Sequence, residues 1–162
     1  MTLKPYMPQN EIAVIDLLMH AIHPRRVLEY GAGGSTLRWS KVRTVEEWLS
    51  VEHSEEWFRK VSQEARIPVH MLTGSPTDAD AYVNAPGIHG YFDLILVDGL
   101  WRVECVRESV KRLQPWGVVL LHDAGRHDYD AAWDVYPGTA LLTKGTEAAN
   151  GLLALWGNVW DR

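Results

Sequence analysis

Apolar and polar positions along the chain follow two spacings, which predict helices and strands in alternation. Residues 8–22 carry Ile12, Ile15 and Met19 on one helical stripe, and His23-Pro24 ends that helix because a residue before proline avoids the helical region. Short apolar runs predict buried strands at 26–30, 47–52, 68–72, 92–97, 118–121, 139–143 and 152–156. The segments between them predict helices at 35–41, 54–65, 78–83, 102–113 and 128–133.

Strands that alternate with helices predict a mostly parallel sheet covered by helices on both faces. Pro115-Trp116-Gly117 predicts a turn after the 102–113 helix, and Asn150-Gly151 favours a hairpin between the last two strands. We therefore expect an α/β fold: a three-layer, doubly wound, seven-stranded sheet that ends in a β-hairpin. The 162 residues fit one domain, 1–162, with the helix of residues 1–24 packed on its core.

Acidic residues follow four of the predicted strands: Glu29, Glu52, Asp98 and Asp123. In an open parallel sheet, ligands bind at the carboxyl ends of the strands, so we expect these acids to face one crevice. Glu52 follows the glycines at 31–34 by roughly twenty residues, the distance at which nucleotide-type folds place the acid that accepts from ribose hydroxyls.

The segment VLEYGAGGST, residues 27–36, places a glycine turn directly after the first strand, where backbone can approach a ligand. It departs from the dinucleotide pattern G-x-G-x-x-G, because the third glycine would fall on Thr36 and Glu29 would repel a pyrophosphate. A ligand with an ammonium group suits Glu29 better. The chain also has no Tyr-x-x-x-Lys pair, so a nicotinamide-dependent oxidoreductase is the weaker alternative.

The acid-x-Gly-x-Gly arrangement of Glu29, Gly31 and Gly33 resembles motif I of class I S-adenosylmethionine-dependent methyltransferases, and the resemblance covers nearly the whole chain. It implies the Rossmann-like methyltransferase fold with S-adenosylmethionine (SAM) as cofactor. The adenine would lie near Ser75, with Asp78 as an alternative. The cofactor-binding residues implied are Glu29, Gly31, Gly33, Ser35, Glu52, His53, Ser75 and Asp98.

Val97-Asp98-Gly99 and His122-Asp123-x-x-Arg126 resemble the strand ends of a group of small methyltransferases and, more distantly, of plant glucuronoxylan O-methyltransferases. The longer N-terminal region of the plant enzymes is absent here, so their substrate does not carry over. The resemblance implies O-methylation of a small molecule or sugar. The alternative outside the enzymes is a non-catalytic module that binds the cofactor within a larger complex.

Transfer to a hydroxyl needs alignment of the acceptor and a route for its proton, through a general base or a metal ion. The candidate catalytic residues are Asp98, His122, Asp123 and Arg102. Asp98 is the first choice as base or hydrogen-bond acceptor, and His122 with Asp123 is either a base with its orienting acid or part of a metal site. We assign no metal ion to the site. If one is present, we expect Mg²⁺ or Mn²⁺ bound by Asp98 and Asp123.

Two arginines, Arg102 and Arg126, flank the expected methyl site and would favour an anionic acceptor unless neighbouring acids pair with them. His127 is expected at the surface, and Trp101 is the tryptophan closest to the candidate chemistry.

Composition and net charge limit the partners and the cellular location that we expect. A net charge of −5 disfavours a nucleic-acid partner, and residues 1–10 lack the apolar core of a signal peptide. No run is long enough for a membrane span, and the sole cysteine, Cys105, excludes an internal disulfide. We expect a cytoplasmic protein, with a homo-oligomer as one way to complete a site that lacks a cap.

Overall fold

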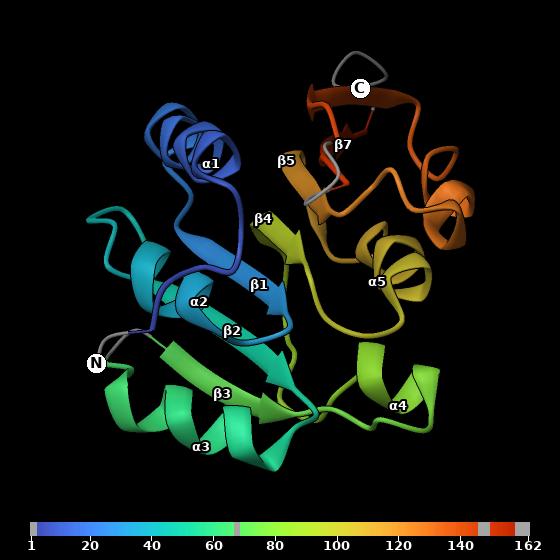
Figure 1. Ribbon diagram of the computed structural model, residues 1–162. Helices are drawn as coiled ribbons and strands as arrows, with labels where there is room; N and C mark the ends of the chain where they lie inside the picture. Colours follow the sequence, from blue (N-terminus) through green and yellow to red (C-terminus); the bar gives the residue numbers. More distant parts are fainter. Residues whose placement is uncertain (1–2, 67–68, 146–149, 158–162) are drawn as a thin grey trace.

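The computed structural model describes residues 3–66, 69–145 and 150–157, and its described part contains one seven-stranded sheet (Figure 1). The strand order is β3-β2-β1-β4-β5-β7-β6. Five strands run parallel to one another: β1 (Arg26–Tyr30), β2 (Glu47–Glu52), β3 (Val69–Thr73), β4 (Phe92–Val97) and β5 (Leu113–His122). The hairpin strands β6 (Gly138–Thr143) and β7 (Leu152–Trp156) pair antiparallel. The predicted fold class, including its closing hairpin, is confirmed.

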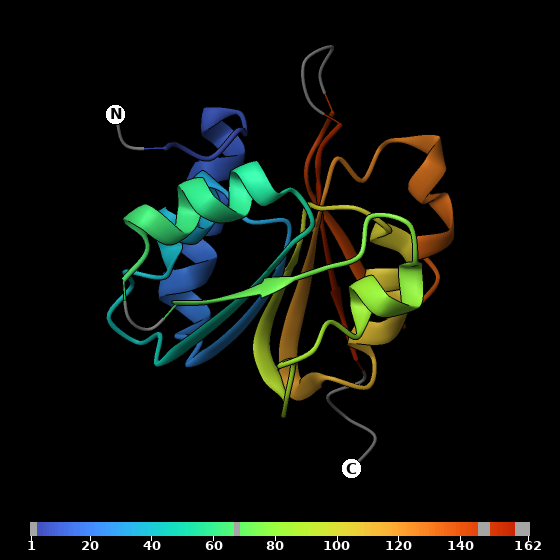
Figure 2. The same ribbon diagram turned by 90° about the horizontal axis from the view of Figure 1, so that it is seen from below.

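Helices cover both faces of the sheet, as Figure 2 shows. One face carries α1 (Gln9–Ile22), α2 (Gly34–Trp39) and α3 (Glu55–Glu64), and the other carries α4 (Ala79–Val83), α5 (Arg102–Ser109) and the 3₁₀ helix η1 (His127–Ala132). No helix of the described residues is both long and apolar enough to cross a membrane.

Apolar side chains pack on both sides of the sheet, because helices cover both of its faces and its strands are apolar at nearly every position. In β1, Val27 packs under α1 and α2, while Leu28 and Tyr30 pack on the α4–α5 side. The same period of two places Glu29 on the α1–α2 side with Val27. In β2, β4 and β5, successive side chains likewise point to opposite faces of the sheet up to the strand ends.

The segment before the fifth predicted strand differs from the expectation. Helix α5 ends at Ser109, and β5 begins at Leu113, so Pro115-Trp116-Gly117 lies inside the strand rather than in a turn. Pairing with β4 advances from Phe92 to Leu94 while β5 advances from Leu113 to Val118. The irregularity accommodates a proline, which cannot donate to a regular ladder and is tolerated at bulges. Pro68, the expected start of the third strand, lies outside the described residues.

Candidate functional site

A cavity of about 350 Å³ opens at the carboxyl ends of β1, β2 and β4. Of the residues that the sequence suggested for cofactor binding, Gly31, Gly33, Ser35, Glu52, His53 and Asp98 line it. Glu29 and Ser75 do not belong to its lining. The N-terminal segment contributes Lys4 and Tyr6 to the wall, so residues ahead of α1 border the site as well.

The glycine turn after β1 packs backbone against backbone on the turn after β4. Gly31 has φ +98°, and a Cβ there would lie 2.6 Å from the Gly99 nitrogen. At Gly34, a Cβ would overlap the backbone of Lys4 and Pro5. Glycine is therefore required at both positions, for a left-handed conformation at Gly31 and for close approach at Gly34.

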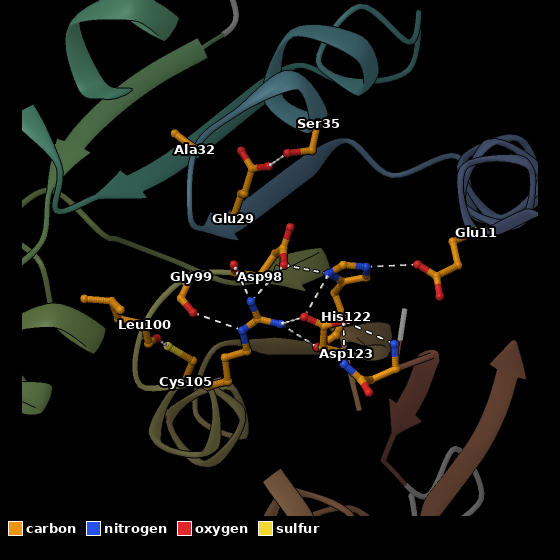
Figure 3. Close-up of polar contacts among 12 residues, drawn as sticks. Glu11, Glu29, Ala32, Ser35, Asp98, Gly99, Leu100, Cys105, His122 and Asp123 are labelled. Carbon is orange, nitrogen blue, oxygen red and sulfur yellow. Dashed lines mark hydrogen bonds and ion pairs between the residues drawn. The ribbon is translucent and has the colours of Figure 1, made fainter. Parts of the chain in front are cut away.

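Glu29 precedes the glycine turn and has no exposed surface. Figure 3 shows its contact with Ser35. Its carboxylate accepts hydrogen bonds from four side chains: Ser35, Thr36, Trp48 and Ser50. The expectation that Glu29 contacts a ligand is therefore corrected: it ties the start of α2 to β2. Ser35 lines the cavity, and its hydroxyl donates to Glu29.

Complete burial raises the pKa of Glu29 to about 7 from 4.5, against the opposing effect of its four hydrogen bonds. A raised pKa in the folded state means that folded protein holds a proton which unfolded protein releases between these two values. The stabilisation is therefore complete below 4.5, is lost as the pH rises toward 7, and is absent above that.

We expect the pH dependence of unfolding to reveal this buried carboxyl. From pH 5 to pH 8, wild type should lose on the order of 2–3 kcal/mol of unfolding free energy relative to Glu29→Gln, whose amide does not titrate. Denaturant unfolding of both proteins across this range is the measurement. A wild-type-minus-variant difference that stays constant with pH would show that Glu29 is ionised throughout.

Glu52 joins the glycine turn to the segment after β2. Its carboxylate accepts from the backbone N–H of Ala32 at 3.0 Å and of Ser54 at 2.7 Å, and His53 Nδ1 lies 3.0 Å from Oε1. Glu52 and His53 also border a second cavity of about 550 Å³ between α3 and β3. The Glu52 carboxylate thus stands at the boundary of both cavities, where each oxygen can accept a further hydrogen bond.

The adenine assignment at Ser75 is not supported. Ser75 Oγ accepts from the backbone N–H of Thr77 and Asp78, which closes a turn, and the Asp78 carboxylate accepts from Ala81 N at the start of α4. Neither residue borders the two cavities, whereas Thr73 at the end of β3 lines the larger one. Both candidate side chains accept from local backbone groups, and the position of the adenine stays a prediction.

Asp98, His122 and Asp123 come together around the ends of β4 and β5 (Figure 3). Arg102 contacts both carboxylates of this group. His122 Nδ1 lies 2.7 Å from Asp98 Oδ1, and an Arg102 nitrogen lies 3.1 Å from the same oxygen. Figure 3 shows the second Asp98 oxygen without a dashed contact among the residues drawn. Because Asp98 lines the cavity, its carboxylate offers an acceptor there.

His122 is corrected as a general base, because both ring nitrogens are engaged. Nε2 lies 2.9 Å from Glu11 Oε2 while Nδ1 contacts Asp98, and Asp123 is more distant at 3.9 Å. Burial acts to lower the pKa of His122, but the Asp98 hydrogen bond and the charges of Asp98, Asp123 and Glu11 outweigh it, and the pKa is raised. A ring held between carboxylates as an imidazolium has no lone pair with which to take a proton.

Arg102 is corrected as an anion-binding residue. Its guanidinium donates to the carbonyls of Gly99, His122 and Asp98, and it pairs with the carboxylates of Asp98 and Asp123. All three nitrogens of the guanidinium thus contact protein oxygens. Arg102, which also lines the cavity, holds the turn after β4 on the end of β5.

Asp123 holds the end of β5 in place. It has φ +58°, and its carboxylate accepts from the backbone and side chain of Asn150 and lies 3.5 Å from Arg102. Burial acts to raise its pKa, but the charges of His122 and Arg102 and the Asn150 contacts lower it overall. Asp123 is absent from the cavity lining and its described contacts are structural, so its catalytic role stays a prediction.

A divalent metal ion does not fit the candidate ligands Asp98 and Asp123. The Arg102 guanidinium already lies between their carboxylates, and His122 is engaged on both sides. Within the ranges that the structure describes, no group of three or more histidine, cysteine or acidic side chains is arranged to hold a metal. Protein cations thus occupy the positions next to these carboxylates that a metal ion would need.

The remaining candidates lie at the periphery. Arg126 is partly exposed, 3.5 Å from Asp128, with its guanidinium over the Tyr129 ring. His127 is exposed, as expected. Trp101 directly precedes α5, has φ +51° and is exposed beside the turn after β4.

Sequence reasoning missed Glu11, which reaches His122 from α1 and is 1% exposed. A signal for it exists: Glu11 stands four residues before Ile15, on the stripe that faces the core. An acid on an apolar stripe needs a buried partner.

No protein-family model matches this sequence, and no curated protein matches it. Solved structures do resemble it. An O-methyltransferase from Bacillus cereus in complex with SAH superposes with a TM-score of 0.69 at 18% identity, over 91% of this chain and 80% of that chain. The O-methyltransferase TomG from Streptomyces achromogenes, involved in tomaymycin synthesis and bound to SAM, gives 0.62 at 18% identity, over 94% and 82%.

An RNA-modifying enzyme resembles the chain equally well. The 16S rRNA N2 G1207 methyltransferase of T. thermophilus, in complex with AdoMet and guanosine, gives a TM-score of 0.65 at 15% identity, over 95% of this chain and 44% of that chain. The chain therefore has the Rossmann-like methyltransferase fold. Because one fold serves several acceptors, the acceptor has to be argued from the site.

Proposed function

We propose that the protein is a SAM-dependent methyltransferase that methylates a hydroxyl oxygen of a small molecule or sugar. The observation that carries the proposal is the cavity in which the glycine turn after β1, the Glu52 carboxylate after β2 and the Asp98 carboxylate after β4 meet. Structural similarity to O-methyltransferases with SAH or SAM bound supports the same reaction class.

The cavity lining offers a partner for each part of SAM. Glu52 would accept hydrogen bonds from the ribose hydroxyls, and the side-chain-free surface of Gly31 and Gly33 would let the ligand approach the backbone. Asp98 and Lys4 present opposite charges to the same cavity, as an amino-acid group with an ammonium and a carboxylate requires. SAM would supply an electrophilic methyl group on a sulfonium sulfur.

The charges around the methyl site favour a cationic ligand. Three carboxylates, Glu11, Asp98 and Asp123, surround two cations, His122 and Arg102. The cluster thus keeps an excess of negative charge, and Asp98 is the member that lines the cavity. Such an excess attracts a ligand that carries ammonium and sulfonium groups.

For the acceptor, the main contribution of the protein is alignment, because transfer requires the oxygen to stand in line behind the methyl group. With His122 and Arg102 engaged, Asp98 is the cavity residue that can accept a hydrogen bond from an acceptor hydroxyl and turn its lone pair toward the methyl group. Because Arg102 is committed, the acceptor is proposed without an anionic group at this position.

The proposal predicts selective binding of SAM and SAH. By calorimetry, both should bind more tightly than NAD, and Glu52→Ala should weaken SAH binding by about 1–3 kcal/mol, the usual loss of hydrogen bonds to a charged group. Glu56→Ala is the control, because Glu56 is an exposed acid that pairs with Lys60 in the following helix. Tighter binding of NAD, or unchanged SAH affinity in folded Glu52→Ala, would refute the cofactor assignment.

Catalysis is tested with methyl-labelled SAM and a set of phenols, catechols and sugars. Label in a methyl ether identifies both the reaction and the acceptor class. SAM binding without transfer to any compound would favour the alternative of a cofactor-binding module.

A further inference from the structure

Helix α1 places a buried carboxylate behind the proposed methyl site. Glu11 Oε2 lies 2.9 Å from His122 Nε2, and His122 Nδ1 lies 2.7 Å from Asp98 Oδ1 (Figure 3). The three side chains form a row that runs from the first helix to the cavity. Glu11 and His122 are buried, whereas Asp98 borders the cavity.

The far side of Glu11 is anchored as well. Thr143 Oγ1 at the end of β6 lies 3.1 Å from Glu11 Oε1 and accepts from the backbone N–H of Leu152 at 2.9 Å. Both carboxylate oxygens of Glu11 therefore have a donor, and its position is fixed by the closing hairpin. A charged group that is buried and hydrogen-bonded on both sides holds its neighbours in one geometry.

We propose that Glu11 is a positioning residue of the active site, which acts through the His122 ring to fix the Asp98 carboxylate at the cavity. The inference rests on the proposed methyltransferase function for its catalytic consequence. Glu11 is too deeply buried behind His122 to act on a ligand itself, and it is not part of the cavity lining. Its effect must therefore pass through the ring.

Every charged group around the ring is compatible with this role. His122 faces Glu11 from α1, Asp98 after β4 and Asp123 after β5, while Arg102 from α5 donates to its backbone carbonyl. Glu11 and Asp98 accept from opposite ring nitrogens, so the imidazolium cannot rotate without losing both contacts. Removing the Glu11 charge frees the ring and, with it, the Asp98 oxygen that it holds.

A double-mutant cycle tests the route of this effect. With the acceptor found in the labelled-SAM assay, Glu11→Gln should lower kcat by about tenfold, the lower end of the loss when a partner behind a functional group is removed. In an Asp98→Asn background the same substitution should change kcat by less than about twofold, because residues that act through one another are not additive. Losses that multiply independently would overturn the proposal.

Nuclear magnetic resonance provides a readout that does not need SAM. In Glu11→Gln, the ring ¹⁵N signals of His122 should report loss of the imidazolium at lower pH than in wild type, and the Asp98 carboxyl ¹³C signal should shift. Asp16→Asn is the matched control: it neutralises an acid of the same helix that contacts Arg38 and Trp39 and not His122, and it should leave the Asp98 signal in place. Glu11→Asp, which keeps the charge but is shorter, should shift the Asp98 signal while it retains the imidazolium.

The kinetic and NMR experiments together distinguish failure of the proposed function from failure of the positioning role. If wild type transfers no methyl group but Glu11→Gln moves the Asp98 signal, the proposed function is wrong and the link from Glu11 to Asp98 stands. If Asp98 is unaffected in Glu11→Gln and Glu11→Asp, the positioning role is wrong even in an active methyltransferase. An Asp98 shift of equal size in Asp16→Asn would likewise overturn it, because loosened packing of α1 would then explain the effect.

Discussion

Asp98→Asn is expected to lower methyl transfer at saturating SAM by a factor on the order of 10² or more, the scale on which a positioned proton-accepting group contributes. Asp98 is the acidic residue that joins the cavity to the buried cations His122 and Arg102. Asparagine keeps the size of the side chain but removes the charge that aligns the acceptor hydroxyl. Affinity for SAH, whose ammonium would lose one charged partner, should fall by much less than turnover.

The measurement is turnover with the acceptor from the labelled-SAM assay, together with calorimetric binding of SAH. Asp128→Asn is the control, because it makes the same substitution at an exposed acid beside Arg126. Near-wild-type turnover in a folded Asp98→Asn protein would mean that the methyl site lies elsewhere in the cavity, and only the cofactor half of the proposed function would remain.

Gly31→Ala is expected to abolish measurable SAM and SAH binding and to destabilise the fold. A side chain at φ +98° costs about 1–3 kcal/mol of backbone strain. The new Cβ would also meet backbone atoms of Gly99, and backbone cannot move aside without opening the contact between the turns after β1 and β4. These turns form two walls of the proposed cofactor cavity, so binding and stability should fall together.

Gly33→Ala provides a control within the same turn. Gly33 has an extended φ of −174°, and a Cβ there would meet no atom closer than Ser35 Oγ at 4.0 Å. Denaturant unfolding should therefore give a stability close to wild type for Gly33→Ala and a clear loss for Gly31→Ala. Equal stabilities for the two variants would show that the turn around Gly31 can relax, contrary to the packing described here.

Much of the site could be predicted because its signals are local. The glycine turn, Glu52 and Asp98 follow short apolar runs, and strands in a parallel sheet deliver such residues to one edge. The structure places these residues around one cavity. The turn predicted at Pro115-Trp116-Gly117 is wrong for a local reason as well: these residues favour a turn, but the ladder between β4 and β5 accommodates them as an irregularity.

The roles of Glu29, Arg102 and His122 could not be predicted, because each depends on which groups lie next to it. Glu29 has a ligand-binding pattern in the sequence, yet it meets Trp48 and Ser50 from the neighbouring strand and is closed off. Arg102 was left between two interpretations, and its donors are consumed by carbonyls of turns that the sequence does not bring together. Hydrogen-bond partners of this kind exist only once the strands have paired.

The sequence by itself determined the alternation of strands and helices, the glycine turn, and the strand ends at which acids stand, because these follow from the periods of the helix and the strand. Only the tertiary structure decided which acids face the cavity and which are consumed inside the protein. Glu11 and His122 are 111 positions apart, and their contact depends on how α1 packs on the ends of β4 and β5. A buried charge takes the partner that packing supplies, and no local pattern in the sequence records that choice.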